Sequence, residues 1–184
     1  MNSLKRDPII NVIHNGIKRG IEVAVKNHCY VDAAILVYSG IDSMAYLGMP
    51  ELQDDVERKD FIDWADRYID IAVTDAPTGL EYYAARCGVV HTHSASSRLF
   101  RSGKVRMLFY SSEPDPPIRF DPSIDSTFVV VSVPVLVQAF FAGVDRFIVD
   151  LYKDKERARI ADDRFKNILH SATVEELENN GSDA

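Results

Sequence analysis

Apolar residues recur every three or four positions through the first half of the chain. This is the spacing of one face of an α-helix, and it predicts helices over about 7–27, 30–47 and 58–73. The second of these segments is apolar on nearly every side. Because a helix without a polar face is buried all round, we expect 30–47 to form the centre of the core.

A fourth helix is predicted by the residues at its start. Thr78 is followed three positions later by Glu81. This is the capping-box pattern, in which each side chain accepts a hydrogen bond from the backbone N–H of the other residue. We expect the helix that begins here to end at about His91 or His93.

The pattern changes after this fourth helix. Segments 104–111 and 127–133 are short and rich in Val, Phe and Tyr, which is typical of strands. Between them, 112–125 holds four of the eight prolines of the chain, so we expect no regular element there. We expect the two strands to pair as a hairpin with a long loop.

Two further helices are predicted near the end of the chain. Pro134 stands where a first helical residue would lie and predicts a helix to about Tyr152, and a charged amphipathic segment over 155–169 closes the fold. A chain of 184 residues suits a single domain with a full core. We therefore expect a mainly α fold, an antiparallel helical bundle with a small β-hairpin appendage at about 104–133, in one domain over 1–171.

Charge is distributed unevenly along the chain. The net charge is −7, and the segment 172–184 holds four acidic residues and no Lys or Arg, which predicts an acidic and disordered tail. From residue 86 to residue 112 there is no acid, and this segment is either a solvated loop or a surface for an acidic partner such as RNA. Its five basic residues are Arg86, Arg98, Arg101, Lys104 and Arg106.

The sequence favours a cytoplasmic protein without a membrane span. Cys29 and Cys87 form no CxxC pair, and the first residues lack the apolar core of a secretory signal. The longest uncharged stretch, over 126–144, is interrupted by Pro134 and Gln138, and its first half is β-branched. It is better explained as a buried strand that leads into a buried helix.

The candidate chemistry stands late in the fourth predicted helix, where four positions separate Arg86 from His91. An arginine can neutralise a phosphate, and a histidine can move a proton near neutral pH. The spacing resembles the R-x4-6-H signature of HEPN domains, helical proteins that include many metal-independent ribonucleases. The segment 83–92 is also similar to a block in uncharacterised bacterial proteins, and we take Tyr83, at its start, as a supporting residue.

The HEPN resemblance implies an endoribonuclease that needs no metal or other cofactor. His91 would act as general base or acid near the RNA 2′-hydroxyl, Arg86 would hold the scissile phosphate, and the products would carry 2′,3′-cyclic phosphate and 5′-hydroxyl ends. HEPN enzymes join the motif helices of two protomers, which implies a homodimer through the Arg86 helix, and an antitoxin or regulatory protein is a further candidate partner. The RNA backbone would be contacted by Arg98, Arg101, Lys104 and Arg106.

Helix geometry leaves the working histidine open. Positions five apart lie about 140° apart around a helix and positions seven apart nearly coincide, so His93, unlike His91, shares the side of Arg86. A supporting acid is available in Asp42, which stands in the otherwise apolar second helix and needs a partner if it is buried. Arg86 is a candidate for that partner, although Asp42 could instead face solvent.

Several features depart from the HEPN pattern or have a second explanation. Cys87 follows the arginine where many HEPN nucleases have Asn, Asp or His, and the β appendage with its proline-rich loop is not part of the minimal four-helix unit. Small residues in the Arg86 helix would let another backbone approach closely, either from a second protomer or from the same chain. These are Ala84, Ala85 and Gly88.

Three other interpretations stay open. Arg86 and His91 could be structural, as an ion pair and a helix cap. Cys87, His91 and His93 offer ligand types that zinc accepts, although no fourth ligand is visible. A non-catalytic HEPN-like module that binds RNA, a nucleotide or a protein partner would account for the acidic net charge. The chain has no Walker loop, GxGxxG, GxSxG or DxD motif, so nucleotide hydrolysis, dinucleotide chemistry and serine hydrolysis have no support.

Overall fold

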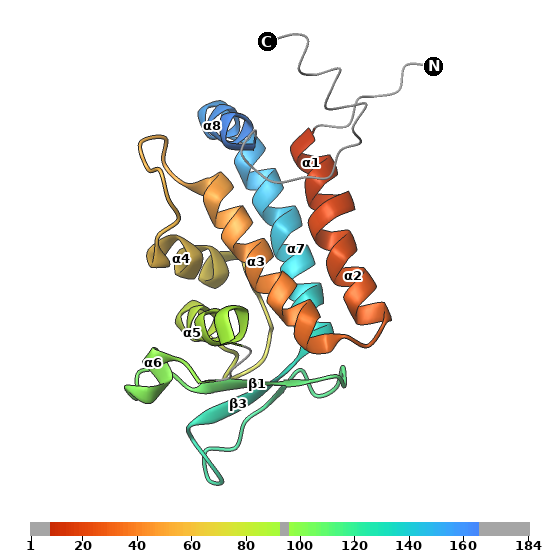
Figure 1. Cartoon of the computed structure of the whole chain (residues 1–184), viewed down its shortest axis with the longest axis vertical. Helices are drawn as coiled ribbons and strands as arrows, with labels where there is room; N and C mark the ends of the chain where they lie inside the picture. Colours follow the sequence, from red (N-terminus) through yellow and green to blue (C-terminus); the bar gives the residue numbers. More distant parts are fainter. Residues whose placement is uncertain (1–7, 93–95, 166–184) are drawn as a thin grey trace.

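Helix α3 (Tyr30–Gly48) lies at the centre of the fold, as its apolar sequence predicts (Figure 1). The structure is a computed structural model that describes residues 8–92 and 96–165. Within these residues α3 contacts helices on several sides and one strand of the sheet. Six of its side chains have no exposed surface: Ala33, Ala34, Val37, Tyr38, Ile41 and Met44.

The first helical stretch runs alongside α3 and confirms the helix predicted over 7–27 (Figure 1). It is continuous but not uniform, since its middle is a π-helical turn that the apolar spacing does not indicate. A turn at 27–29 joins it to α3. The three parts are α1 (Pro8–Val12), η1 (Ile13–Lys18) and α2 (Arg19–Lys26).

Helix α7 (Val133–Tyr152) packs against α3 and confirms the helix predicted from Pro134 onwards. It begins one residue earlier than predicted, because the Ser132 hydroxyl oxygen caps it by accepting a hydrogen bond from the Val135 N–H at 3.3 Å. The buried Lys18 fastens the first helical stretch to α7. Its Nζ lies 2.5 Å from Asp145 Oδ1 and donates a hydrogen bond to the Phe141 carbonyl oxygen at 3.2 Å.

Helix α4 (Arg58–Tyr68) ends earlier than the predicted segment 58–73. Its last carbonyl, that of Tyr68, accepts a hydrogen bond from Arg146 Nη2 at 2.6 Å. The same carbonyl oxygen lies 2.4 Å from the place where a Cβ of Gly143 would be. Contacts with α7 therefore end α4 at Tyr68, and the backbone is extended at Ile69.

Helix α5 (Gly79–Thr92) begins where the capping box predicts, and it is helical up to Thr92, the last residue described before 93–95. It lies between α4 and the sheet and also contacts α3 (Figure 1). A short helix that the sequence analysis does not predict, α6 (Arg98–Arg101), follows after the undescribed residues 93–95. The side chain of Ser97 caps α6 by accepting a hydrogen bond from the Phe100 N–H at 3.2 Å.

The predicted hairpin is wrong in its strand direction. Strands β1 (Met107–Ser111) and β3 (Phe128–Ser132) fall within the two predicted segments, but they pair in parallel. The proline-rich segment between them holds a two-residue strand, β2 (Ile118–Arg119), which pairs antiparallel with β3, so the order is β1-β3-β2.

The apolar sequence of β3 explains this order. Val129 and Val131 of β3 are fully buried, so the most apolar strand takes the middle of the sheet. The proline-rich segment is long enough to carry the chain past that middle position and back into it. The sheet is joined to the helices by a hydrogen bond of 2.6 Å between the hydroxyls of Tyr38 in α3 and Tyr110 in β1.

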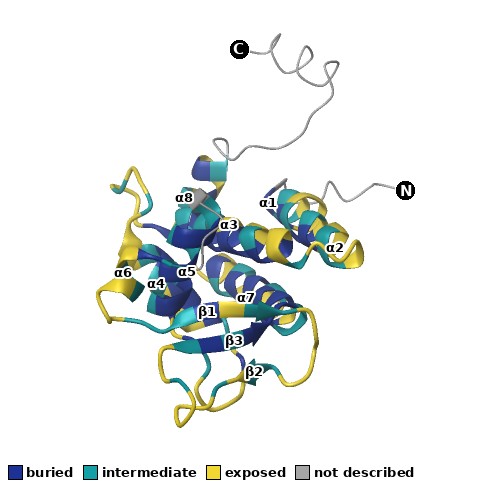
Figure 2. Cartoon of the chain, turned by 60° about the horizontal axis from the view of Figure 1, so that its bottom comes forward, coloured by how far each residue is buried: buried dark blue, intermediate teal, exposed yellow. Residues whose placement is uncertain are grey.

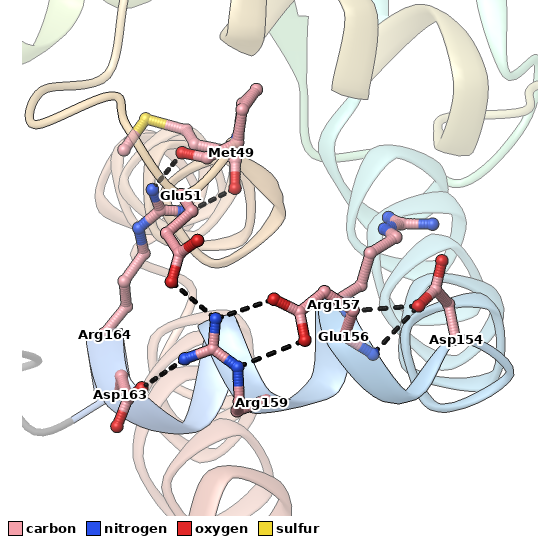
Figure 3. A network of polar contacts seen from close by, with 9 residues as sticks. Met49, Glu51, Asp154, Glu156, Arg157, Arg159, Asp163 and Arg164 are labelled. Atoms are coloured by element: carbon pink, nitrogen blue, oxygen red, sulfur yellow. Dashed lines mark hydrogen bonds and ion pairs between the residues drawn. The ribbon is translucent and has the colours of Figure 1, made fainter.

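Helix α8 (Lys155–Phe165) lies within the predicted segment 155–169, whose last residues are outside the described range. Its buried Arg164 donates hydrogen bonds to the carbonyl oxygens of Met49 and Pro50, and to that of Gln53 at 3.0 Å. Figure 3 shows Arg164 reaching the segment that follows α3, and Arg159 lying between three carboxylates. These are Glu51, Glu156 and Asp163.

Exposure differs between the sheet and the segments around it. Figure 2 shows the loops around the sheet and α6 as mainly exposed, whereas β3 is largely buried. Among the described helices, none is both long and apolar enough to cross a membrane. The acidic segment 172–184, predicted to be disordered, lies outside the described residues.

The contact between α4 and α7 gives a stability prediction. Gly143→Ala should lower the free energy of unfolding by about 1–3 kcal/mol, because the new Cβ would overlap the Tyr68 carbonyl. Gly20→Ala is the matched control, since nothing lies within 4 Å of its Cβ, and this variant should be neutral or up to about 1 kcal/mol more stable. Chemical denaturation of both variants checks this. Equal effects at the two positions would contradict the close packing of α7 on α4.

Candidate functional site

The start of α5 is fixed by the capping box that the sequence predicts. The Thr78 N–H donates to Glu81 Oε2 at 2.9 Å, and the Glu81 N–H donates to Thr78 Oγ1 at 3.3 Å. A carboxylate from α4 adds a further contact, because the Gly79 N–H donates to Asp66 Oδ1 at 2.5 Å. Three otherwise unsatisfied N–H groups at the start of the helix are thereby bonded to side chains.

Glu81 also pairs with Arg106, one of the four residues predicted to contact RNA. Arg106 Nε donates to Glu81 Oε1 at 2.6 Å and Nη2 donates to Oε2 at 2.9 Å, so the pair is bidentate. Nη2 also donates to the Asp75 carbonyl oxygen at 3.2 Å, and the guanidinium lies over the Phe120 ring. The Arg106 side chain is thus paired within the chain and 18% exposed, and its contact with RNA stays a prediction.

Arg86 is paired with Asp42, the partner considered for it from sequence. Arg86 Nε donates to Asp42 Oδ2 at 2.9 Å, and the two side chains are 25% and 27% exposed. Helix α5 supplies the arginine and α3 supplies the acid. The alternative in which Asp42 only faces solvent is therefore excluded.

The groups around Arg86 shift its pKa and that of the neighbouring Tyr83. Burial lowers the pKa of Arg86, but the hydrogen bond and charge of Asp42, together with Cys87, outweigh this and raise it. Burial raises the pKa of Tyr83, and a hydrogen bond with Cys87 raises it further, while the charges of Arg86 and Arg58 act in the opposite direction. Arg86 is thus a permanent cation at physiological pH, and Tyr83 stays a neutral hydroxyl.

The two candidate histidines are described only in part. The backbone of α5 stays helical through Thr92, so the last turn is not unwound, and His91 stands about 140° around the axis from Arg86. For His91 only the helical backbone is described, and His93 lies outside the described residues. Among the described residues, no group of three His, Cys, Asp or Glu side chains could hold a metal ion, and the zinc interpretation stays a prediction.

The small residues of α5 are explained within one chain. Ala84, Ala85 and Gly88 are all buried by neighbouring elements of the same protomer. The partly exposed side of the helix is a different set, consisting of Leu80, Tyr83, Arg86, Cys87 and Val90. A close contact between two copies of the chain is therefore not needed to account for the small residues.

A basic cavity opens beside α5, and it holds two of the four residues predicted to contact RNA. Its volume is about 480 Å³, and Arg98 and Lys104 are among its lining residues. Arg101 lies on a neighbouring surface and donates to the Ser96 hydroxyl at 3.4 Å. The cavity is lined by Arg58, Tyr83, Cys87, Ser97, Arg98, Leu99, Ser102 and Lys104. We call it the α5–α6 cavity.

One cation of this cavity was missed by the sequence analysis. Arg58 is the first residue of α4, and its guanidinium carbon lies 5.4 Å from the centre of the Tyr83 ring. The residue stands among acidic neighbours in the sequence, outside the basic segment 86–112. Only the packing of α4 on α5 brings it to the cavity, and no local pattern signals this.

Comparisons of the chain with protein-family models, with curated proteins and with solved structures found no match.

The pairing of Glu81 with Arg106 predicts a pH-dependent contribution to stability. Burial acts to raise the pKa of Glu81, but the hydrogen bonds from Arg106 and from the Thr78 backbone outweigh it, and the pKa is lowered from 4.5. The contribution is therefore full above pH 4.5 and is lost as the pH falls through the lower pKa of the folded state. Glu81→Gln should cost about 2–3 kcal/mol at neutral pH, and this difference should disappear in acid.

The free energy of unfolding of the wild type and of Glu81→Gln, measured between about pH 2 and pH 7, checks this expectation. These limits lie on either side of the ordinary carboxyl pKa of about 4. Glu113→Gln is the control, since Glu113 and Arg119 form an exposed pair that should contribute no more than about 1 kcal/mol. A cost for Glu81→Gln that is the same at every pH would contradict the assignment.

Proposed function

We propose that the protein is a metal-independent endoribonuclease of HEPN type, acting through Arg86 and His91 of α5. The observation that carries the proposal is the ion pair between Arg86 and Asp42. It holds an arginine in place on the helix that carries the histidine, while leaving its side chain one-quarter exposed. A fixed and accessible cation is what the stabilisation of a charged phosphate transition state requires.

The proposed roles follow from the chemistry of the phosphodiester. His91 takes the proton of the 2′-hydroxyl, and the resulting 2′-oxygen forms a bond to phosphorus. The bond from phosphorus to the 5′-oxygen breaks, that oxygen takes a proton from water and leaves as a 5′-hydroxyl, and the protonated His91 returns its proton to the hydroxide that is left. Arg86 neutralises the charge that grows on the other phosphate oxygens. Asp42 is a positioning residue, because it acts through Arg86.

The angle between Arg86 and His91 around the axis of α5 determines whether one copy of the chain can form the site. Since Arg86 and His91 stand about 140° apart on a helix that stays regular, a single copy does not present both on one side. We therefore propose that two copies associate through the end of α5 that carries Arg86 and His91 and complete the site, with the arginine of one copy facing the histidine of the other, while Tyr83 and Cys87 stay open to the α5–α6 cavity. His93 is the alternative base within one copy.

RNA would be bound by the basic residues next to this site. Arg98 and Lys104 at the α5–α6 cavity, with Arg101 nearby, supply positive charge for the phosphate backbone in a chain whose net charge is −7. Contacts of this kind give affinity with little choice of sequence. The free thiols Cys29 and Cys87 are consistent with action in a reducing compartment, and we propose the cytoplasm.

The proposal predicts cleavage of single-stranded RNA by the purified protein in excess EDTA, with 2′,3′-cyclic phosphate and 5′-hydroxyl ends. Arg86→Ala and His91→Ala should each lower the cleavage rate by roughly 10²–10⁴-fold. Asp42→Asn should lower it less, since Arg86 is still present but is held less firmly. Gel analysis with end-group assignment, on variants shown to be folded by circular dichroism, measures these rates.

Arg119→Ala is the matched control, because it removes an arginine of an exposed ion pair on β2 and should leave cleavage unchanged. Activity that survives His91→Ala but not His93→Ala would move the base to His93 and remove the need for two copies. If no RNA is cut although RNA still binds, the nuclease proposal fails and the non-catalytic module is the better assignment. Light scattering gives the oligomeric state of the same samples.

A further inference from the structure

Three cations converge on the α5–α6 cavity from different elements. Arg58 comes from the start of α4, Arg98 from the start of α6, and Lys104 from the segment before β1. All three residues are exposed. Within the described part of the chain, no carboxylate lines the cavity, and no ion pair involves any of the three.

Several other arginines of the molecule are held by oxygen atoms of the protein. Arg86, Arg106 and Arg159 are each paired with a carboxylate, and Arg164 is bonded to backbone carbonyls. Three like charges around one concave surface repel one another, and the concave shape focuses their field. The cavity is therefore a place where an anion would be attracted and would relieve the repulsion.

The contacts of Arg58 prepare it for such an anion. Its guanidinium carbon lies over the Tyr83 ring, 5.4 Å from the ring centre, and Phe61 packs against the same ring with the centres 5.6 Å apart. This cation–ring contact restricts a planar, forked donor group without using a carboxylate. A guanidinium restricted in this way suits two parallel hydrogen bonds to a phosphate, whereas Lys104 supplies a compact charge.

The size of the cavity and its other lining residues indicate a ligand larger than a free phosphate ion. A volume of about 480 Å³ lies in the range of about 300–1,000 Å³ that is typical of small-molecule sites. Leu99 and the Tyr83 ring add apolar surface, and Ser97 and Ser102 add hydroxyl groups. A ligand with one strongly charged end and a larger, partly apolar remainder fits this lining.

We propose that the α5–α6 cavity binds one nucleotide unit, with its phosphate held by Arg58, Arg98 and Lys104 and its nucleoside against Tyr83 and Leu99. The inference deepens the proposed function and rests on it in one respect, since an RNA cut beside Arg86 would place a neighbouring nucleotide here. The same chemistry is offered by a free nucleoside monophosphate. The two sources are separated by the choice of probe.

Cys87 provides a direct reporter of occupancy, and Cys29 provides its internal control. Cys87 lines the cavity, whereas Cys29 is exposed at the turn before α3. Alkylation by iodoacetamide, which is uncharged, can be followed at both thiols by mass spectrometry. Adenosine 5′-monophosphate should slow the alkylation of Cys87 several-fold and leave that of Cys29 unchanged, and adenosine should protect neither.

Variants of the cations test which groups hold the phosphate. Arg58→Gln and Lys104→Ala should each raise the Kd for adenosine 5′-monophosphate, obtained from the protection of Cys87, by about tenfold or more, as expected for the loss of a charge-assisted hydrogen bond. Lys26→Ala removes an exposed cation of α2, away from the cavity, and should leave the Kd unchanged. Comparing rates with and without nucleotide within each variant removes any change in the reactivity of Cys87 itself.

A short 2′-O-methyl oligonucleotide distinguishes the two sources and keeps the test separate from cleavage, because it carries phosphates but no nucleophilic 2′-hydroxyl. Protection at much lower concentrations than adenosine 5′-monophosphate assigns the cavity to an RNA chain, and the reverse order assigns it to a free nucleotide. Protection without any RNA cleavage would support this inference while the proposed function fails. Cys87 left unprotected by both probes, or protected equally in Arg58→Gln, Lys104→Ala and Lys26→Ala, would overturn it.

Discussion

The ion pair between Glu81 and Arg106 is the interaction on which the arrangement around α5 depends. One buried carboxylate completes the capping box at the start of the helix and also holds the arginine that precedes β1. The beginning of the helix and the beginning of the sheet are therefore fixed by the same side chain. Since the carboxylate is 7% exposed and is satisfied only when both partners are present, loosening either element leaves a buried charge short of hydrogen bonds.

One side of helix α5 packs against the rest of the chain, and another side is partly exposed. Its small residues are buried within the chain, and Arg86 is tied to α3 through Asp42. Its partly exposed side carries Tyr83 and Cys87, which line the α5–α6 cavity. Helix α5 thus presents Tyr83 and Cys87 to the cavity, while the surrounding cations come from the starts of α4 and α6 and from the segment before β1.

The features that could be predicted from the sequence are those set by neighbours in the chain. The capping box at Thr78 and the apolar character of α3 depend on residues within a few turns, and both were confirmed. The end of α4 is set by Arg146 and Gly143 of α7, far along the chain, and the parallel pairing of β1 with β3 depends on which strand is buried most deeply. The place of Arg58 at the cavity also depends on residues far apart in the chain, because it results from the packing of α4 on α5. The pairing of Arg86 with Asp42 was open to prediction only because an acid in an apolar helix needs a partner.

The contacts of Arg164 have a consequence for the order in which the molecule can be completed. The carbonyl groups of Met49, Pro50 and Gln53 follow the central helix and are made early during synthesis, but the guanidinium that binds them stands near the end of the last described helix. Until Arg164 has left the ribosome, these carbonyls lack their guanidinium partner, although that of Pro50 still accepts a hydrogen bond from the Gln53 N–H at 3.1 Å. The segment between α3 and α4 can therefore reach its final conformation only after α8 has been translated, although both of its flanking helices emerge long before.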